Sequence, residues 1–162
     1  MRPFQLFAAM PPEQFRGFLD ALKEKAPGAY VQALGLTAGV LKARPVFLQR
    51  QPAERRAELV RKALARVMSN PISEEMLAVY FLECRNELLV EWLDGLGLEH
   101  EKGTLKGEDA PPEPPVAKLA EALEAFRKNA KDDDRADREL LLKAFAAQTS
   151  ITWPELDKLL AA

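Results

Sequence analysis

The chain has 162 residues, of which 48% are apolar and 30% are charged, and its formal net charge is −2. This balance is typical of a globular protein and excludes a disordered chain, and the length suits one ordinary domain. The single cysteine and the single histidine exclude a disulfide, a cysteine or histidine zinc cage and an iron–sulfur site. We therefore expect neither a metal nor a cofactor.

The composition predicts an all-α fold. Ala, Leu, Glu, Lys and Arg make up 90 residues, whereas Val, Ile and Thr make up only 14. The first group favours helices and the β-branched group favours strands. Prolines and glycines separate the helical stretches, which predicts an irregular bundle of about seven helices around one long central helix.

The first twelve residues begin with a basic residue and an apolar stretch, as a signal peptide does. The stretch is short, contains Gln5 and ends at Pro11 and Pro12 without a cleavage pattern. We expect an apolar tail folded onto the body instead. Its anchors would be Phe4, Leu6 and Phe7. Residues 76–98 are apolar but are interrupted by five charges, so we expect a soluble protein, and the lone cysteine suits the cytoplasm.

The expected helices of the N-terminal part follow from the 3.6-residue spacing of apolar side chains. Residues 12–25 carry a stripe of Phe15, Phe18, Leu19 and Leu22. A further helix follows Pro52 and is expected to bury Ala53, Ala57, Val60, Leu64 and Met68. Between these helices, glycine and proline divide the chain into shorter pieces. The predicted ranges are 30–34, 37–43, 45–49, 52–68 and 70–94.

The rest of the chain predicts a small β-hairpin near residues 98–106, a proline-rich linker at 108–115 and three C-terminal helices. Thr152-Trp153-Pro154-Glu155 is typical of a capping box for the last helix. We therefore expect a main bundle over residues 1–98, a loop and linker over 99–115, and a three-helix segment over 116–162. That segment would pack on the bundle to give one globular domain.

Most catalytic patterns are missing from the sequence. The glycines at 35 and 39 lack the lysine and hydroxyl of a phosphate loop, and His100 reads as a solvated loop residue. Asp132, Asp133 and Asp134 do not have the spacing of a calcium loop and are typical of a helix N-terminus. We predict no catalytic residues. The sequence leaves an enzyme open but gives it no support, and it favours a protein that is not an enzyme.

The charges are segregated along the chain. Residues 42–66 contain eight basic and two acidic residues, whereas residues 70–101 contain eight acidic residues and one arginine. On the helix at 52–68, Arg55, Lys62 and Arg66 would form one outward-facing line. On the helix at 70–94, the carboxylates would form one stripe that could bind a basic partner or attract the adjacent basic helix. That acidic stripe contains Glu83, Glu87, Glu91 and Asp94.

Two residues fall on the apolar arc of the same helix. Cys84 is expected to be a small buried side chain. Arg85 must pair with a carboxylate from elsewhere, reach past its neighbours to water, or face a crevice that holds an anionic ligand. We favour a buried ion pair and keep the anion site as the alternative.

Two functions remain open. Helical surfaces with segregated charge and no catalytic set favour a protein–protein interaction module. The alternative is a nucleic-acid-associated protein that uses the basic segment 42–66, although a pI of about 5.6 speaks against it. A small-molecule role around Arg85 ranks third. The sequence predicts no particular partner and no oligomeric state.

Overall fold

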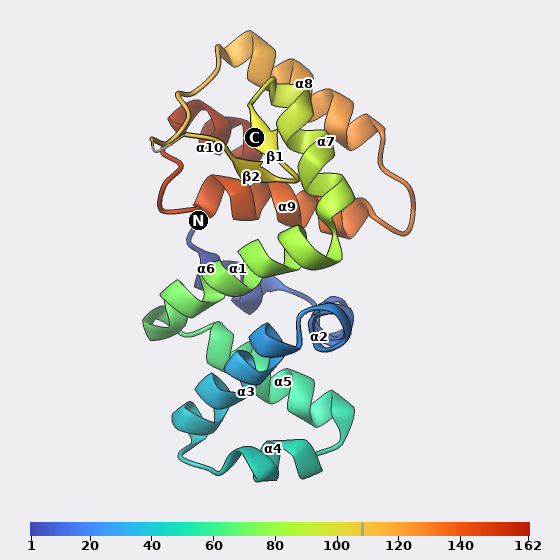
Figure 1. Ribbon diagram of the computed structural model, residues 1–162, viewed down its shortest axis with the longest axis vertical. Coiled ribbons are helices and arrows are strands. Elements are labelled where there is room, and N and C mark those ends of the chain that lie inside the picture. The colour runs from blue at the N-terminus through green and yellow to red at the C-terminus, as the bar shows by residue number, and fades with distance from the viewer. Residues whose placement is uncertain (108) are drawn as a thin grey trace. The chain divides into compact units, whose positions relative to one another are not determined.

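The computed structural model describes residues 1–107 and 109–162. Over these residues the chain forms ten α-helices, one 3-10 helix, one π-helix and two short strands, which confirms the all-α fold (Figure 1). The α-helices outnumber the seven expected. In chain order the elements are α1 (Pro3–Ala9), α2 (Pro12–Lys25), α3 (Pro27–Leu41), α4 (Pro45–Arg50), α5 (Ala53–Leu64), η1 (Val67–Ser69), α6 (Asn70–Val79), η2 (Tyr80–Cys84), α7 (Asn86–Leu96), β1 (His100–Glu101), β2 (Thr104–Leu105), α8 (Val116–Lys128), α9 (Arg135–Ala147) and α10 (Pro154–Ala161).

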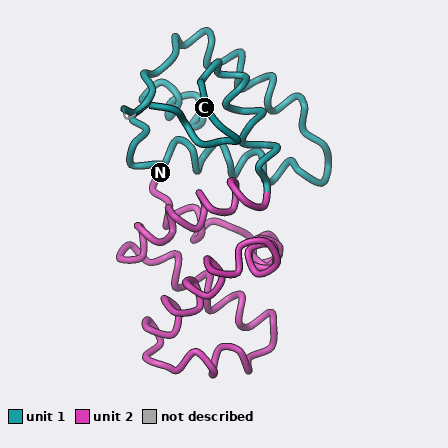
Figure 2. The backbone as a smooth tube through the Cα atoms, in the orientation of Figure 1, with its two compact units in different colours: residues 1, 85–162 teal, residues 2–84 magenta. Residues whose placement is uncertain are grey.

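The chain forms two compact units (Figure 2). Unit 2 is Arg2–Cys84, and unit 1 is Arg85–Ala162 together with Met1. The sequence placed the first boundary after residue 98, whereas the units divide after Cys84. Unit 2 has 12 basic and 8 acidic residues, and residues 85–162 have 11 basic and 17 acidic residues. The two units therefore carry opposite net charges of +4 and −6.

An aromatic cluster forms the core of unit 2. The Phe7 ring is fully buried and lies 5.8 Å from Phe15 and 5.4 Å from Phe18 between ring centroids. Phe18 continues the cluster to Tyr80 at 4.4 Å. The N-terminal residues thus fold onto the body as expected, and they do so as a helix. Of the expected anchors, Leu6 and Phe7 are buried and Phe4 is half-buried.

Two helices of unit 2 differ from their expected extents. α3 runs without a break through Gly35 and Gly39, because its buried face offsets the cost of about 1 kcal/mol that each glycine adds to a helix. α5 ends at Leu64, since Arg66 takes an extended conformation (φ −82°, ψ 140°). The helical register is lost there, so Met68 is 86% exposed and was wrongly assigned to the core.

The expected long helix at 70–94 is divided. α6 passes into the π-helix η2, and Arg85 then leaves helical geometry altogether (φ −133°, ψ 44°) before α7 begins. The wider i→i+5 turn adds one residue to a helical turn. Side chains after it therefore face a different direction from the one that the spacing of α6 predicts. Cys84 is consequently half-buried rather than part of the core.

Unit 1 is built from α7, α8, α9 and α10 around a second aromatic cluster. Trp92 on α7 lies 5.5 Å from Phe126 on α8 and 5.9 Å from Phe145 on α9, measured between ring centroids. Trp153, just before α10, lies 5.2 Å from Phe145. The three C-terminal helices expected from the sequence are confirmed, and they form a unit together with α7.

The predicted hairpin is confirmed. Strands β1 and β2 pair antiparallel, with His100 opposite Leu105 and Glu101 opposite Thr104. Gly103 in the turn has φ +95°, and a Cβ atom at this position would lie 2.8 Å from Leu89 Cδ2 on α7. Glycine is required here both for the backbone conformation and for the close approach to α7.

The predicted linker at 108–115 begins at residue 108, which lies outside the described residues. Its remaining part docks on the last helix. The Glu113 carboxylate accepts the backbone N–H groups of Glu155 and Leu156 at 2.8 and 3.1 Å. The capping box predicted at Thr152 is therefore wrong, because a carboxylate from the linker caps α10 instead. Among the described residues, none of the helices has the length and apolar character that a membrane crossing needs.

Candidate functional site

Helix α4 is anchored to unit 2 by one fully buried side chain, that of Leu48. At about 100° per residue, Val46 and Arg50 lie opposite Leu48, and Phe47 lies beside Arg50, about 100° from Leu48. The helix lies between α3 and α5 at one end of unit 2 (Figure 1). Most of its surface is therefore open to a partner.

Three large apolar side chains are exposed at α4 and the end of α3. The exposed fractions are 41% for Leu41, 45% for Val46 and 42% for Phe47. Single exposed apolar residues are ordinary, but here three of them occur within seven consecutive residues, where α3 ends and α4 begins. Exposed basic residues alternate with them. We call the following six residues the α4 surface: Leu41, Lys42, Arg44, Val46, Phe47 and Arg50.

The basic segment 42–66 contains two acidic residues, and each of them is paired with an arginine. Glu54 Oε1 lies 3.1 Å from Arg16 Nη1, and Glu58 Oε1 lies 2.5 Å from Arg61 Nη2. The hydrogen bond from Arg61 holds the pKa of Glu58 below its usual value. Since both carboxylates are neutralised by other arginines, the cations of the α4 surface have no acidic neighbour of this segment to balance them.

Two basic residues of the same segment have structural roles. The Arg56 guanidinium donates to the carbonyl oxygens of Gln49 and Gln51, each at 3.3 Å, and so joins the end of α4 to α5. Arg61 donates to the Phe7 carbonyl at 3.2 Å in addition to its pair with Glu58. Arg56 thus fixes the end of α4, and Arg61 joins α5 to α1.

The predicted nucleic-acid face is only partly assembled. Arg55, Lys62 and Arg66 are all exposed, and within the described part of the chain none of them forms an ion pair. However, α5 ends at Leu64, so Arg66 lies beyond the helix that was expected to align all three. The face therefore consists of two helical residues and a neighbouring one.

The predicted acidic stripe does not form a free surface. Glu83 lies in η2, while the other three carboxylates lie on α7 beyond the break at Arg85. Each of those three contacts a side chain of unit 1. Glu87 contacts Arg85, Glu91 contacts Arg138, and Asp94 contacts His100. A basic partner would have to displace these contacts, so the interpretation of the stripe as a docking face is weakened.

His100 is held in place rather than solvated in a loop. Its Nε2 lies 2.7 Å from Asp94 Oδ1, and its Nδ1 accepts the backbone N–H of Gly103 at 3.1 Å. Its side chain is 10% exposed. The expectation of an exposed loop residue was wrong, because pairing of β1 with β2 brings the ring onto the end of α7.

Arg85 pairs with carboxylates, as the first interpretation of the sequence expects. Its Nε lies 2.8 Å from Asp137 Oδ2 on α9, and its Nη1 lies 3.2 Å from Glu87 Oε1. The Nε–H is not aligned for a hydrogen bond to that oxygen, so the contact with Asp137 is an ion pair. The Arg85 side chain is 26% exposed, so this pair lies at the edge of the core rather than inside it.

The buried ion pair of this unit belongs to Arg138, which the sequence analysis missed. Arg138 is 5% exposed and lies on α9. Its guanidinium contacts Glu91 on α7, Asp134 Oδ1 at 3.1 Å and the Phe126 carbonyl at 3.0 Å. It also lies over the Phe126 ring, 4.7 Å from the centroid. One side chain thus ties α7, α8 and α9 together.

Asp134 completes this network at the start of α9. Burial alone would raise the pKa of Asp134. That effect is outweighed by the Lys131 backbone N–H, the Arg138 guanidinium and the charges of Arg138 and Arg85, so the pKa is lowered. The expectation that the aspartate run marks a helix N-terminus holds for Asp134, since it precedes the first residue of α9.

Comparison with protein-family models, with curated proteins and with solved structures finds no match to this chain. Function must therefore be inferred from the site itself.

In the part of the chain that the structure describes, no group of three His, Cys, Asp or Glu side chains is placed to hold a metal. Two buried hydroxyls bond to the backbone, since Ser73 donates to the Leu64 carbonyl at 2.6 Å and Thr37 to the Ala33 carbonyl at 2.8 Å.

The lowered pKa of Asp134 predicts how acid destabilises unit 1. The unfolded carboxylate titrates near pH 3.9, so its contribution is complete above that value and is lost as the pH falls through the lower folded pKa. Asp134→Asn should cost about 1–2 kcal/mol at neutral pH, because a charged hydrogen bond becomes a neutral one. The difference from the parent should shrink as the pH falls below about 4.

Urea unfolding at several pH values, followed by tryptophan fluorescence, measures this difference, because both tryptophans lie in unit 1. Glu139→Gln is the matched control, since the Glu139 carboxylate pairs with Arg127 at the surface. Its effect should stay below about 1 kcal/mol at every pH. A constant difference between Asp134→Asn and the parent from neutral to acidic pH would contradict the assignment.

Proposed function

We propose that the protein is a non-enzymatic interaction module whose α4 surface binds an acidic, partly apolar helical segment of another protein. The observation that carries this proposal is the exposure of Val46 and Phe47 between the cations Arg44 and Arg50. Apolar side chains of the partner would cover Val46 and Phe47, and its carboxylates would pair with Arg44 and Arg50. The lone cysteine supports placing the module in the cytoplasm.

Charge complementarity favours an acidic partner. Both carboxylates of the surrounding segment are paired with arginines, and unit 2 as a whole has a net charge of +4. Complementary charge speeds association and selects the partner, while apolar contacts in the centre supply most of the affinity. A phosphate backbone would meet the same cations but would leave Val46 and Phe47 without apolar contact. The mixed character of the surface therefore supports a protein partner over the nucleic acid that was kept as the alternative.

A titration with a synthetic peptide tests this proposal. The probe is a fluorescent helical peptide of about 20 residues with leucines on one face and glutamates on the other. We expect saturable binding that weakens with salt. Phe47→Ala and Arg44→Glu should each weaken binding roughly tenfold, because they remove the apolar centre and reverse one contact charge.

The controls separate the two functions. Lys25→Glu reverses an exposed charge elsewhere on unit 2 and should change peptide affinity less than about twofold. The same titrations with duplex DNA follow at two salt concentrations. Absence of peptide binding contradicts the proposal. Tighter binding of duplex DNA than of peptide, lost in Arg44→Glu but not in Phe47→Ala, would support the nucleic-acid alternative instead.

A further inference from the structure

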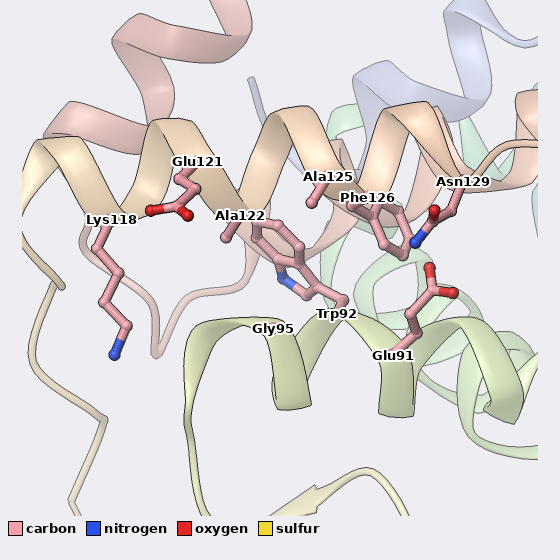
Figure 3. A pocket seen from close by; sticks show the side chains of 9 residues that line it. All are labelled: Glu91, Trp92, Gly95, Lys118, Glu121, Ala122, Ala125, Phe126 and Asn129. Carbon is pink, nitrogen blue, oxygen red and sulfur yellow. The ribbon is translucent and has the colours of Figure 1, made fainter.

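Unit 1 contains a pocket between α7 and α8 that the α4 surface does not involve. Its volume is about 320 Å³, near the lower end of the range for small-molecule sites (Figure 3). Short residues on the two helices leave this space open. The lining residues are Glu91, Trp92, Gly95, Lys118, Glu121, Ala122, Ala125, Phe126 and Asn129.

A buried hydrogen-bond donor at this pocket has no partner. Trp92 is fully buried, and its Nε1–H donates to none of the described residues. The other tryptophan shows the ordinary arrangement, since Trp153 Nε1 donates to the Pro111 carbonyl at 3.0 Å. Leaving such a donor unpaired in a buried position destabilises the folded protein. An acceptor supplied by a ligand would remove this cost.

Two oppositely charged side chains lie at one end of the pocket. Figure 3 shows the Trp92 indole nitrogen turned toward the end of the pocket where Lys118 and Glu121 project from α8. The Lys118 ammonium reaches across to the end of α7, where it would lie 3.1 Å from a Cβ atom at Gly97. The Lys118 ammonium, the Glu121 carboxylate and the Trp92 indole N–H thus lie at the same end of the pocket.

The remainder of the pocket is mainly apolar. Trp92 and Phe126 are buried beneath it, and Ala122 and Ala125 form the wall on α8 (Figure 3). Glu91, at the end near Asn129, is already neutralised by Arg138. A ligand that fits would have an apolar body at this side and adjacent opposite charges at the other.

We infer that this pocket binds a free α-amino acid with an apolar side chain. Its carboxylate would accept from Trp92 Nε1–H and from the Lys118 ammonium, and its ammonium group would face Glu121. The side chain would lie along Ala122, Ala125 and Phe126. Carboxylate and ammonium on one carbon match the paired charges of Lys118 and Glu121, which a simple carboxylic acid or an amine does not.

Nuclear magnetic resonance of the ¹⁵N-labelled protein tests this inference directly. The chain has two tryptophans, so its spectrum contains two indole N–H signals, which Trp153→Phe assigns. Addition of L-phenylalanine should move the Trp92 signal and leave the Trp153 signal in place. Phenylalaninamide and 3-phenylpropionate, which lack the carboxylate and the ammonium group respectively, should each bind at least roughly tenfold more weakly.

Two substitutions on α8 control for unspecific effects. Ala125→Leu fills the pocket and should abolish the shift, whereas Ala117→Leu changes an exposed alanine of the same helix outside the pocket and should preserve it. An unmoved Trp92 signal, or a shift retained in Ala125→Leu, would overturn the inference. Equal or tighter binding of 3-phenylpropionate would also overturn it, because the ammonium group would then have no role. None of these outcomes bears on the α4 surface.

Discussion

Replacing Arg138 by methionine should lower the free energy of unfolding of unit 1 by about 3–5 kcal/mol. The guanidinium is 5% exposed and is shared by Glu91, Asp134 and the Phe126 carbonyl. Methionine keeps much of the apolar stem but leaves two carboxylates and a carbonyl without their donor. Asp134 and the Phe126 carbonyl are the buried members of this set. The cost of leaving them unpaired in the core exceeds the net value of the ion pair itself.

Urea unfolding followed by tryptophan fluorescence measures this loss, because Trp92 and Trp153 both lie in unit 1. The matched control is Arg127→Met, which breaks an exposed pair with Glu139 at 2.8 Å. It should cost less than about 1 kcal/mol. Equal losses for Arg127→Met and Arg138→Met would contradict the description of Arg138 as the tie between α7, α8 and α9.

Replacing Phe7 by alanine should destabilise unit 2 by about 3–5 kcal/mol. The Phe7 ring is fully buried between Phe15 and Phe18, so its removal leaves a cavity that α1 and α2 can close only in part. Far-ultraviolet circular dichroism during urea unfolding is the appropriate measurement, since unit 2 contains no tryptophan.

Phe4→Ala is the control for this substitution, because Phe4 lies on the same helix and is half-buried. It should cost clearly less than Phe7→Ala, since less apolar surface leaves water when Phe4 folds into place. If both variants unfold at the same urea concentration as the parent, α1 is not part of the core. The expectation that this segment folds onto the body would then be wrong.

Periodicity was sufficient for the regular helices. The stripe of Phe15, Phe18, Leu19 and Leu22 is buried as expected, because each of these side chains repeats on one face of α2. The hairpin at His100 was predictable from its alternation and its glycine turn. These elements are specified by neighbours within a few residues along the chain.

The break at Arg85 could not be predicted in the same way. The apolar pattern continues through Tyr80–Cys84, and a π-turn there needs neither a proline nor a glycine. Arg138 was missed for a different reason. It lies in a strongly charged stretch that resembles a solvated face, and its partner Glu91 is 47 residues away in the sequence. Only the packing of α9 against α7 brings the two side chains together.

The α4 surface could not be predicted from the sequence either. Val46 and Phe47 are residue types that usually lie in a core. The charges of the basic segment 42–66 predicted a binding face on α5 instead. The exposure of Val46 and Phe47 follows from the short length of α4, which buries Leu48 and leaves the opposite face uncovered. A six-residue helix has too few turns to reveal such a face by periodicity.

The binding of an acidic helix at α4 is tested most directly by mapping it on the protein. Backbone amide signals of the ¹⁵N-labelled chain should be recorded while the leucine–glutamate peptide is added. The proposal predicts that the largest changes fall within residues 41–56, at α4 and the adjoining ends of α3 and α5. Changes concentrated on unit 1, or spread evenly over the chain, would contradict it.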